Sequence, residues 1–260
     1  MGAVATHDVI GTGSPPVLFL HGIGGHRTNF AGQLGTFGPK HRCVAWSMPG
    51  YDDSPALAEM TFPALAAAVV RLLDRLDVEQ AVLVGHSMGG MVAQEVTALY
   101  PDRVCGLVLV ATTPVFGDGT GAASRRFLQE RLAPLDAGGT PADMADGIVT
   151  RLTSQPLPEP TRSAAVAGMS AISAATYRAA VECIVTFDRR PDQGLIAVPT
   201  LLVAGSADPL IPLAAMEGMA TDIPGARLEV IDGAGHLVNL EAPAAFDRIL
   251  GDWLAELTAA

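Results

Sequence analysis

The sequence lacks several features that would indicate other classes of protein. Only three cysteines occur among 260 residues, Cys43, Cys105 and Cys183, and no two of them have the C-x-x-C spacing of a zinc or redox site. We therefore expect reduced, buried thiols and no metal site. No apolar run is long enough to span a bilayer, and the first residues lack the basic start and long apolar stretch of a secretory signal. A cytoplasmic protein without a membrane partner is the expectation.

Positive charge is also scarce. Lys40 is the only lysine, and 16 basic residues stand against 27 acidic ones, for a net charge of −11. Such a surface repels phosphate backbones, so we expect no nucleic acid partner. The chain is 49% hydrophobic and 17% charged, which is too apolar for disorder and ordinary for a globular enzyme. Its length fits one domain.

What the sequence does contain is an alternation of strand and helix patterns. Four near-continuous apolar runs have the pattern of strands buried on both faces, at 16–22, 43–50, 81–87 and 104–113. A helix is predicted after the second run, with Thr61 as its N-cap and Pro63 in its first turn, and another after the third run, closed by Pro101. This alternation predicts an α/β fold with a parallel sheet.

The alternation then stops and later resumes. Residues 114–195 contain short helical patterns without a convincing strand, so we predict an inserted helical cap there, within a single domain whose core is formed by 1–113 and 196–260. Further strands are predicted at 199–208 and 226–232, and a final helix from about Ala242 to Leu257.

A glycine-rich corner follows the run 81–87. Gly85-His86-Ser87-Met88-Gly89 matches G-x-S-x-G, with a predicted strand before it and a predicted helix after it. A serine on so tight a turn needs strained backbone angles, and the small glycines, with Gly90, leave room around it. Its hydroxyl would then be exposed at the sheet edge, beside a helix N-terminus that favours negative charge. Ser87 is therefore the candidate nucleophile, and a helix-capping serine in a glycine-rich turn is the alternative.

A serine nucleophile needs a base, and that base needs a carboxylate to orient it. His236 is the candidate base, because it lies in the loop between the last strand and the last helix, at the same sheet edge. Asp208, at the end of the preceding strand, is the candidate acid, although it could be only a turn residue before Pro209. Asp118 is the rival acid. We interpret Asp232 as a strand-end residue.

The oxyanion of an acyl-transfer reaction needs hydrogen-bond donors. The backbone N–H of Met88, directly after the nucleophile, is one candidate, and that of Ile23 in the glycine-rich loop 21–25 is the other. We expect His21 to brace this loop and His86 to be a packing histidine. The candidate residues for an apolar substrate pocket, for each of which core packing is the alternative, are Phe116, Met169, Leu210, Leu237 and Val238.

These motifs together resemble the α/β-hydrolase superfamily. The stretches that carry the resemblance are HGIGG, WSMPGYDDS, VGHSMGG, LLVAGSADPLIP and IDGAGHLVNLEAP. The C-terminal part and the stretch YRAAVECIVTFDRR are most similar to 3-oxoadipate enol-lactonases and their esterase relatives. The resemblance implies a mostly parallel sheet of eight strands, or seven, with a helical cap and no cofactor. The stretch SMPGYDDS departs from the family pattern, with Ser47 for an acid and Asp53 for a glycine.

The function that we predict is hydrolysis of a small carboxylic ester or enol-lactone through an acyl-enzyme, by a monomer or homodimer. Three alternatives stay open at this point. A carbon–carbon bond hydrolase of ring-cleavage products would use the same three side chains, as would a cofactor-free haloperoxidase or perhydrolase. A non-catalytic receptor for a small molecule would use only the fold.

Overall fold

A seven-stranded sheet forms the centre of the molecule. The computed structural model describes residues 4–117 and 121–259. The strand order is β1-β3-β2-β4-β5-β6-β7, with β1 antiparallel to β3 and all other neighbours parallel. The strands are β1 (His7–Ile10), β2 (Val17–Leu20), β3 (Cys43–Trp46), β4 (Ala81–His86), β5 (Val104–Val110), β6 (Thr200–Gly205) and β7 (Arg227–Ile231).

The near-continuous apolar runs arise because both faces of the central strands are buried. Successive side chains of a strand point to opposite faces. In β2, Leu18 and Leu20 pack into one hydrophobic cluster, whereas Val17 and Phe19 pack into another on the other face. All four are at most 1% exposed. Apolar residues are therefore required at every position of this strand, not at alternate ones.

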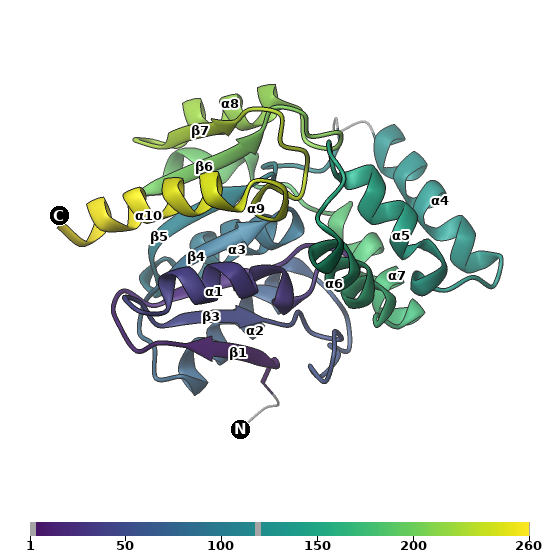
Figure 1. Ribbon diagram of the computed structural model, residues 1–260, viewed down its shortest axis with the longest axis horizontal. Helices are drawn as coiled ribbons and strands as arrows, with labels where there is room; N and C mark the ends of the chain where they lie inside the picture. Colours follow the sequence, from purple (N-terminus) through teal and green to yellow (C-terminus); the bar gives the residue numbers. More distant parts are fainter. Residues whose placement is uncertain (1–3, 118–120, 260) are drawn as a thin grey trace.

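Helices cover both faces of the sheet (Figure 1). One cluster of buried side chains joins the sheet to α1 and α10, and the other joins it to α2, α3 and α8. The bounds of these helices are α1 (Ala31–Phe37), α2 (Phe62–Arg75), α3 (Met88–Leu99), α8 (Leu213–Asp222) and α10 (Pro243–Ala259). The carboxyl ends of the strands, where ligands bind in open α/β sheets, therefore remain available for a site.

The predicted helix after the second apolar run is present as α2. Thr61 is its N-cap, and the Thr61 hydroxyl accepts a hydrogen bond from the N–H of Ala64 at 3.3 Å. Leu65, Val69 and Leu72 lie on one stripe of the helix and are fully buried. The final predicted helix is α10, which begins at Pro243, and its Phe246 and Leu250 are also fully buried.

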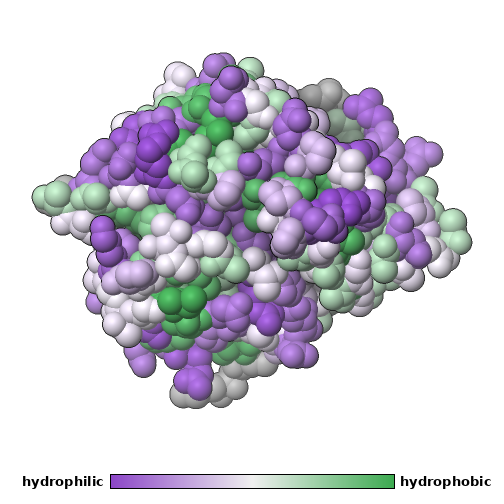
Figure 2. All heavy atoms as spheres, in the orientation of Figure 1, coloured by the Kyte–Doolittle hydropathy of each residue, from purple (hydrophilic) through white to green (hydrophobic). Residues whose placement is uncertain are grey.

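Among the described residues between β5 and β6, four α-helices lie in the segment that the sequence predicts to be a cap. They lie together at one side of the sheet (Figure 1). We call them the inserted helices: α4 (Ala122–Asp136), α5 (Pro141–Leu152), α6 (Glu159–Ser170) and α7 (Ala174–Ile184). In the part of the chain that the structure describes, no helix has the length and apolar character to cross a membrane. The face shown in Figure 2 is mostly hydrophilic or neutral, with separate small hydrophobic patches.

The sheet has seven strands within the described residues, which is the smaller of the two numbers implied by the resemblance. The N-terminal segment supplies only the short strand β1, which pairs with β3. Gly11 follows β1 with φ of 80°, and the chain then enters β2. Six residues separate β1 from β2, and no hairpin joins these two described strands because β1 pairs with β3 and not with β2.

Candidate functional site

Ser87 occupies the strained corner that the G-x-S-x-G pattern predicts. It lies between β4 and α3 with φ of 54° and ψ of −122°, in a region that non-glycine residues rarely adopt. A Cβ atom on Gly85 would come within 2.4 Å of the carbonyl oxygen of Gly89, and one on Gly89 within 2.0 Å of that of Leu20. The glycines on both sides of Ser87 therefore allow the strand, the turn and the helix to pack this tightly.

The backbone of Ser87 is firmly held, whereas its hydroxyl is not. Ser87 N–H donates to the carbonyl of Val110 at 2.9 Å, and the Ser87 carbonyl accepts from the Thr112 hydroxyl at 2.8 Å. All hydrogen bonds of Ser87 within the described part of the chain involve its backbone. The hydroxyl is thus held on a fixed backbone and remains available to a substrate and a base.

His236 and Asp208 form a buried pair at the same edge of the sheet. His236 Nδ1 and Asp208 Oδ2 are 2.8 Å apart, and the side chains are 3% and 2% exposed. Asp208 Oδ1 accepts from the N–H groups of Leu210 at 2.7 Å and Ile211 at 3.1 Å. With an ionised Asp208 the hydrogen lies on Nδ1, and Nε2 keeps its lone pair for a proton.

The electrostatics of Asp208 favour its ionised form. Burial raises the pKa of this carboxyl, but the hydrogen bond and charge of His236 and the two backbone N–H donors together hold the pKa below its ordinary value. Asp208 is therefore suited to stabilise an imidazolium cation on His236. The rival acid, Asp118, lies outside the described residues.

The glycine-rich loop 21–25 lies directly against the corner at Ser87. A Cβ atom on Gly22 would come within 2.8 Å of the Ser87 Cβ and 3.2 Å of the Met88 nitrogen. His21 braces this loop, as predicted: its Nδ1 donates to the Gly22 carbonyl at 2.9 Å, and its Nε2 accepts from the Met48 N–H at 3.0 Å. Across the described residues, no backbone or side-chain acceptor takes the N–H of Ile23 or Met88, so both amides are available as donors.

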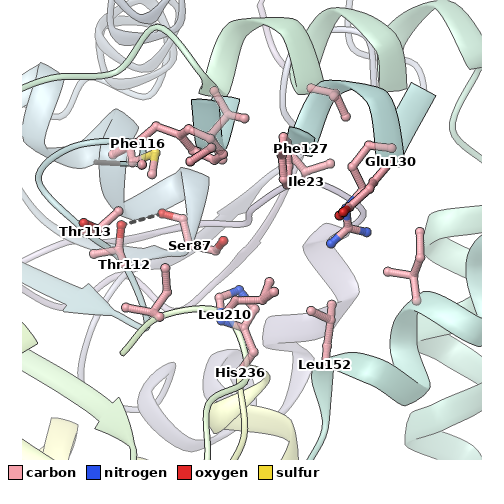
Figure 3. A pocket seen from close by; sticks show the side chains of 18 of the residues that line it. Ile23, Ser87, Thr112, Thr113, Phe116, Phe127, Glu130, Leu152, Leu210 and His236 are labelled. Atoms are coloured by element: carbon pink, nitrogen blue, oxygen red, sulfur yellow. Dashed lines mark hydrogen bonds between the residues drawn. The ribbon is translucent and has the colours of Figure 1, made fainter. Parts of the chain in front are cut away.

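A cavity of about 620 Å³ opens above Ser87 and His236 (Figure 3). Ile23, Ser87 and His236 contribute to its wall together with residues of the inserted helices. Most of the lining is apolar, and Arg126, Glu130 and Arg131 of α4 add charge. Within 4–117 and 121–259, no three His, Cys, Asp or Glu side chains gather closely enough to hold a metal ion.

The predicted pocket residues divide into two groups. Phe116, Met169 and Leu210 line the cavity. Leu237 instead borders a small void of about 30 Å³ and packs with Val149 of α5. Val238 is 0% exposed and belongs to the core between the sheet and α10, because the chain enters the short helix α9 (Val238–Glu241) there and turns it toward the sheet.

The departure in SMPGYDDS is resolved by Asp52, which sequence reasoning missed. The left-handed backbone is at Asp52, with φ of 48°, so Asp52 and not Asp53 stands in the place of the pattern's second glycine. The Asp52 carboxylate contacts the Ser47 hydroxyl, Arg27, and His26 Nε2, the last at 2.7 Å. Asp52 thus supplies, five residues later in the sequence, the negative charge that is absent at position 47. The sequence did contain a signal for this role. Asp52 stands where the family pattern has a glycine, five residues after Ser47, which itself replaces the acid of that pattern.

Two buried histidines predict how stability depends on pH. Burial lowers the pKa of His21 to about 4, and burial, with the neighbouring His236, lowers that of His86 to about 3. An unfolded histidine titrates near 6.5, so between pH 6.5 and about 4 the unfolded chain binds protons that the folded protein does not. The stability present above pH 6.5 is therefore lost as the pH falls, by about 2 kcal/mol per histidine between pH 7 and pH 5.

Urea unfolding at pH 7 and pH 5 measures this loss. We expect the loss to shrink in His21→Gln and again in His86→Gln, whereas His7→Gln, at a half-exposed position in β1, should leave it unchanged. Equal losses in all variants would contradict the assignment.

Comparison with known proteins gives a consistent family. A family profile described as the alpha/beta hydrolase fold matches residues 15–243. The chain is 32% identical over 255 residues to the dihydrolipoyllysine-residue acetyltransferase component of the acetoin cleaving system of Cupriavidus necator, with 92% of this chain covered. It spans only 63% of the length of that relative.

Other relatives are matched over most of their length. The chain is 30% identical to a protein of Variovorax paradoxus provisionally named carbamate hydrolase RutD, with 94% of this chain and 92% of that protein covered. It is 25% identical to 3-oxoadipate enol-lactonase 2 of Acinetobacter baylyi, over 90% of this chain and 86% of that protein. A solved esterase from Thermogutta terrifontis superposes with a TM-score of 0.81 at 27% identity, covering 97% and 93% of the two chains. Because the profile spans most of its length, the chain belongs to the α/β-hydrolase superfamily of hydrolytic enzymes, and an enol-lactonase is among its relatives.

Proposed function

We propose that this protein hydrolyses small carboxylic esters or lactones through an acyl-enzyme on Ser87. The observation that carries the proposal is that Ser87 and His236 line the same cavity, with His236 paired to the buried Asp208. A strained serine, an oriented imidazole and a glycine-rich loop with free amides are the parts that acyl transfer requires. The Ser87 hydroxyl makes no hydrogen bond to His236 within the described part of the chain, and in free hydrolases this contact often tightens only when substrate binds.

In the acylation step, His236 Nε2 takes the proton of the Ser87 hydroxyl while the oxygen attacks the carbonyl carbon. The carbonyl oxygen becomes an oxyanion, which the N–H groups of Ile23 and Met88 stabilise. Asp208 holds the imidazole ring and stabilises the imidazolium. The tetrahedral intermediate then collapses, and the bond to the leaving oxygen breaks as that oxygen takes the proton from His236.

In the deacylation step, water takes the place of the leaving group. His236 removes a proton from the water, which attacks the acyl carbon, and the same amides hold the second oxyanion. Ser87 leaves with the proton returned by His236, and the free acid is released.

The cavity indicates which substrates to test. Its wall combines apolar side chains from the core, such as Met91, with Phe127 and Ile148 from the inserted helices, so it suits an apolar acyl or alcohol part. Its volume, about 620 Å³, is within the range of pockets for small organic molecules. We therefore propose a small-molecule substrate with an apolar body.

A substrate panel tests the proposal. Purified protein and its Ser87→Ala variant are assayed with p-nitrophenyl esters from acetate to octanoate, with lactones, with an aryl carbamate, and with a ring-cleavage dienone. We expect ester or lactone turnover that the substitution abolishes, with greater kcat/KM for acyl chains longer than acetate. Turnover of the dienone or the carbamate alone would replace the proposal by a different hydrolytic reaction. Tight binding of a ligand without turnover would replace it by a receptor.

A further inference from the structure

The backbone of His236 is bonded on two sides. Its N–H donates to the carbonyl of Leu152, the last residue of α5, at 2.8 Å. Its carbonyl accepts from Nε2 of His86, the residue before Ser87, at 2.8 Å. With the ring held by Asp208, the position of His236 therefore depends directly on the inserted helices as well as on the core.

A second link joins the same two segments. Glu241, at the end of α9, accepts hydrogen bonds on Oε2 from the Ser154 N–H at 2.8 Å, the Ser154 hydroxyl at 2.9 Å and the Gly235 N–H at 3.0 Å. The Ser154 hydroxyl also contacts the carbonyl of Gly233. Residues 152–154 are thus fastened to the loop 233–236 through both its backbone and a carboxylate.

The two segments approach so closely that only glycine fits between them. A Cβ atom on Gly235 would come within 2.7 Å of the Ser154 nitrogen, 2.8 Å of Glu241 Oε1 and 2.9 Å of the Leu152 carbonyl oxygen. Real Cβ atoms essentially never make such contacts with backbone atoms. The residue before His236 therefore adapts the loop to this contact.

The contact also carries a cost in stability. Glu241 Oε1 is buried and has no hydrogen-bond partner among the described residues. Leaving a buried polar atom unpaired lowers the stability of the folded state. An unpaired buried atom needs a physical explanation. Stabilisation of the fold does not explain this one, whereas positioning of the neighbouring His236 does.

The same stretch of chain faces the cavity. Ile148 and Leu152 of α5 line it together with His236, whereas Ser154 and Glu241 do not line it. A substrate in the cavity would therefore contact α5 at Ile148 and Leu152, and the end of that helix is hydrogen-bonded to the His236 backbone. Losing the Ser154–Glu241 contact should disturb the imidazole without removing any substrate contact.

We infer that Ser154 and Glu241 are positioning residues for His236, which hold the end of α5 against the loop 233–236 and so set the imidazole relative to Ser87. The inference rests on the proposed function, because it takes His236 as the base. It extends that function by making the inserted helices part of the catalytic geometry in addition to a wall of the cavity. A displacement of a reacting group by about 1 Å can cost about 10²-fold in rate.

The test uses Ser154→Ala and Glu241→Gln, assayed with the ester that the wild-type protein turns over best. Active sites are counted by stoichiometric reaction with a p-nitrophenyl phosphonate, so that kcat refers to folded, competent protein only. We expect kcat per active site to fall about 10-fold or more and KM to change by less than about twofold. Ser154→Thr, which keeps the hydroxyl, should restore most of kcat.

The matched controls are Ser163→Ala and Glu159→Gln, because these two residues form an exposed Ser–Glu hydrogen bond of 2.8 Å within α6. We expect kcat per active site of the controls to equal that of the wild type. Equal kcat per active site in Ser154→Ala, Glu241→Gln and the controls would overturn the inference while leaving the proposed function intact. Full turnover in Ser87→Ala would instead overturn the proposed function, and the inference with it.

Discussion

Ser87→Ala is expected to lower kcat for the best ester by about 10⁵–10⁶-fold, because in the proposed mechanism Ser87 carries the acyl group. A small residual rate over water should remain, since the Ile23 and Met88 amides and the cavity still bind the substrate and stabilise an oxyanion. The assay is steady-state hydrolysis, with enough sensitivity to measure this residual rate.

The control for this substitution is Ser163→Ala, which removes an exposed serine of α6 and should leave the rate unchanged. The thermal midpoint of Ser87→Ala should be no lower than that of the wild type. The substitution removes no hydrogen bond, because the Ser87 side chain makes none among the described residues. A loss of only a few-fold in kcat would mean that Ser87 is not the nucleophile.

Asp208→Asn is expected to lower kcat by about 10⁴-fold with little change in KM. The asparagine amide would donate to His236 Nδ1, so the imidazole would carry its hydrogen on Nε2 and could not accept the Ser87 proton. The charge that stabilises the imidazolium would be lost as well. Both effects act on the transition state, so they appear in kcat.

Two other aspartates provide matched comparisons. Asp232→Asn removes a carboxylate that bonds the Ser206 hydroxyl at 2.9 Å near the same loop, and it should change kcat little. Asp118→Asn tests the rival acid and should also have a minor effect. If Asp118→Asn caused the larger loss, the acid partner of His236 would have to be moved to the segment after β5.

The helices and strands of the core could be predicted because caps and apolar periodicity are contained within each short segment. The cap at Thr61 and the apolar stripe through Leu65 and Val69 are enough to define α2. The apolar runs were longer than the strands they predicted: the run 43–50 contains β3, which ends at Trp46. The run extends past the strand because the loop that follows is buried too, as Met48 and Pro49 are.

The candidate site was predictable where its residues follow strand ends in a known order, as Ser87, Asp208 and His236 do. Residues whose roles depend on contacts between distant segments were not predictable. Glu241 reaches Ser154 across 87 positions of sequence. No periodicity or spacing in one sequence encodes such pairings, because they depend on how the inserted helices and loops pack on the core. The same dependence explains the different positions of Leu210 and Val238.

The most direct test of the central claim is covalent labelling of the protein with a p-nitrophenyl alkylphosphonate, followed by peptide mass spectrometry. The claim predicts one phosphonyl group per chain, on Ser87, with esterase activity lost in proportion to labelling and labelling nearly abolished in His236→Ala. Labelling at another residue, or full activity in protein that is completely labelled at Ser87, would contradict it.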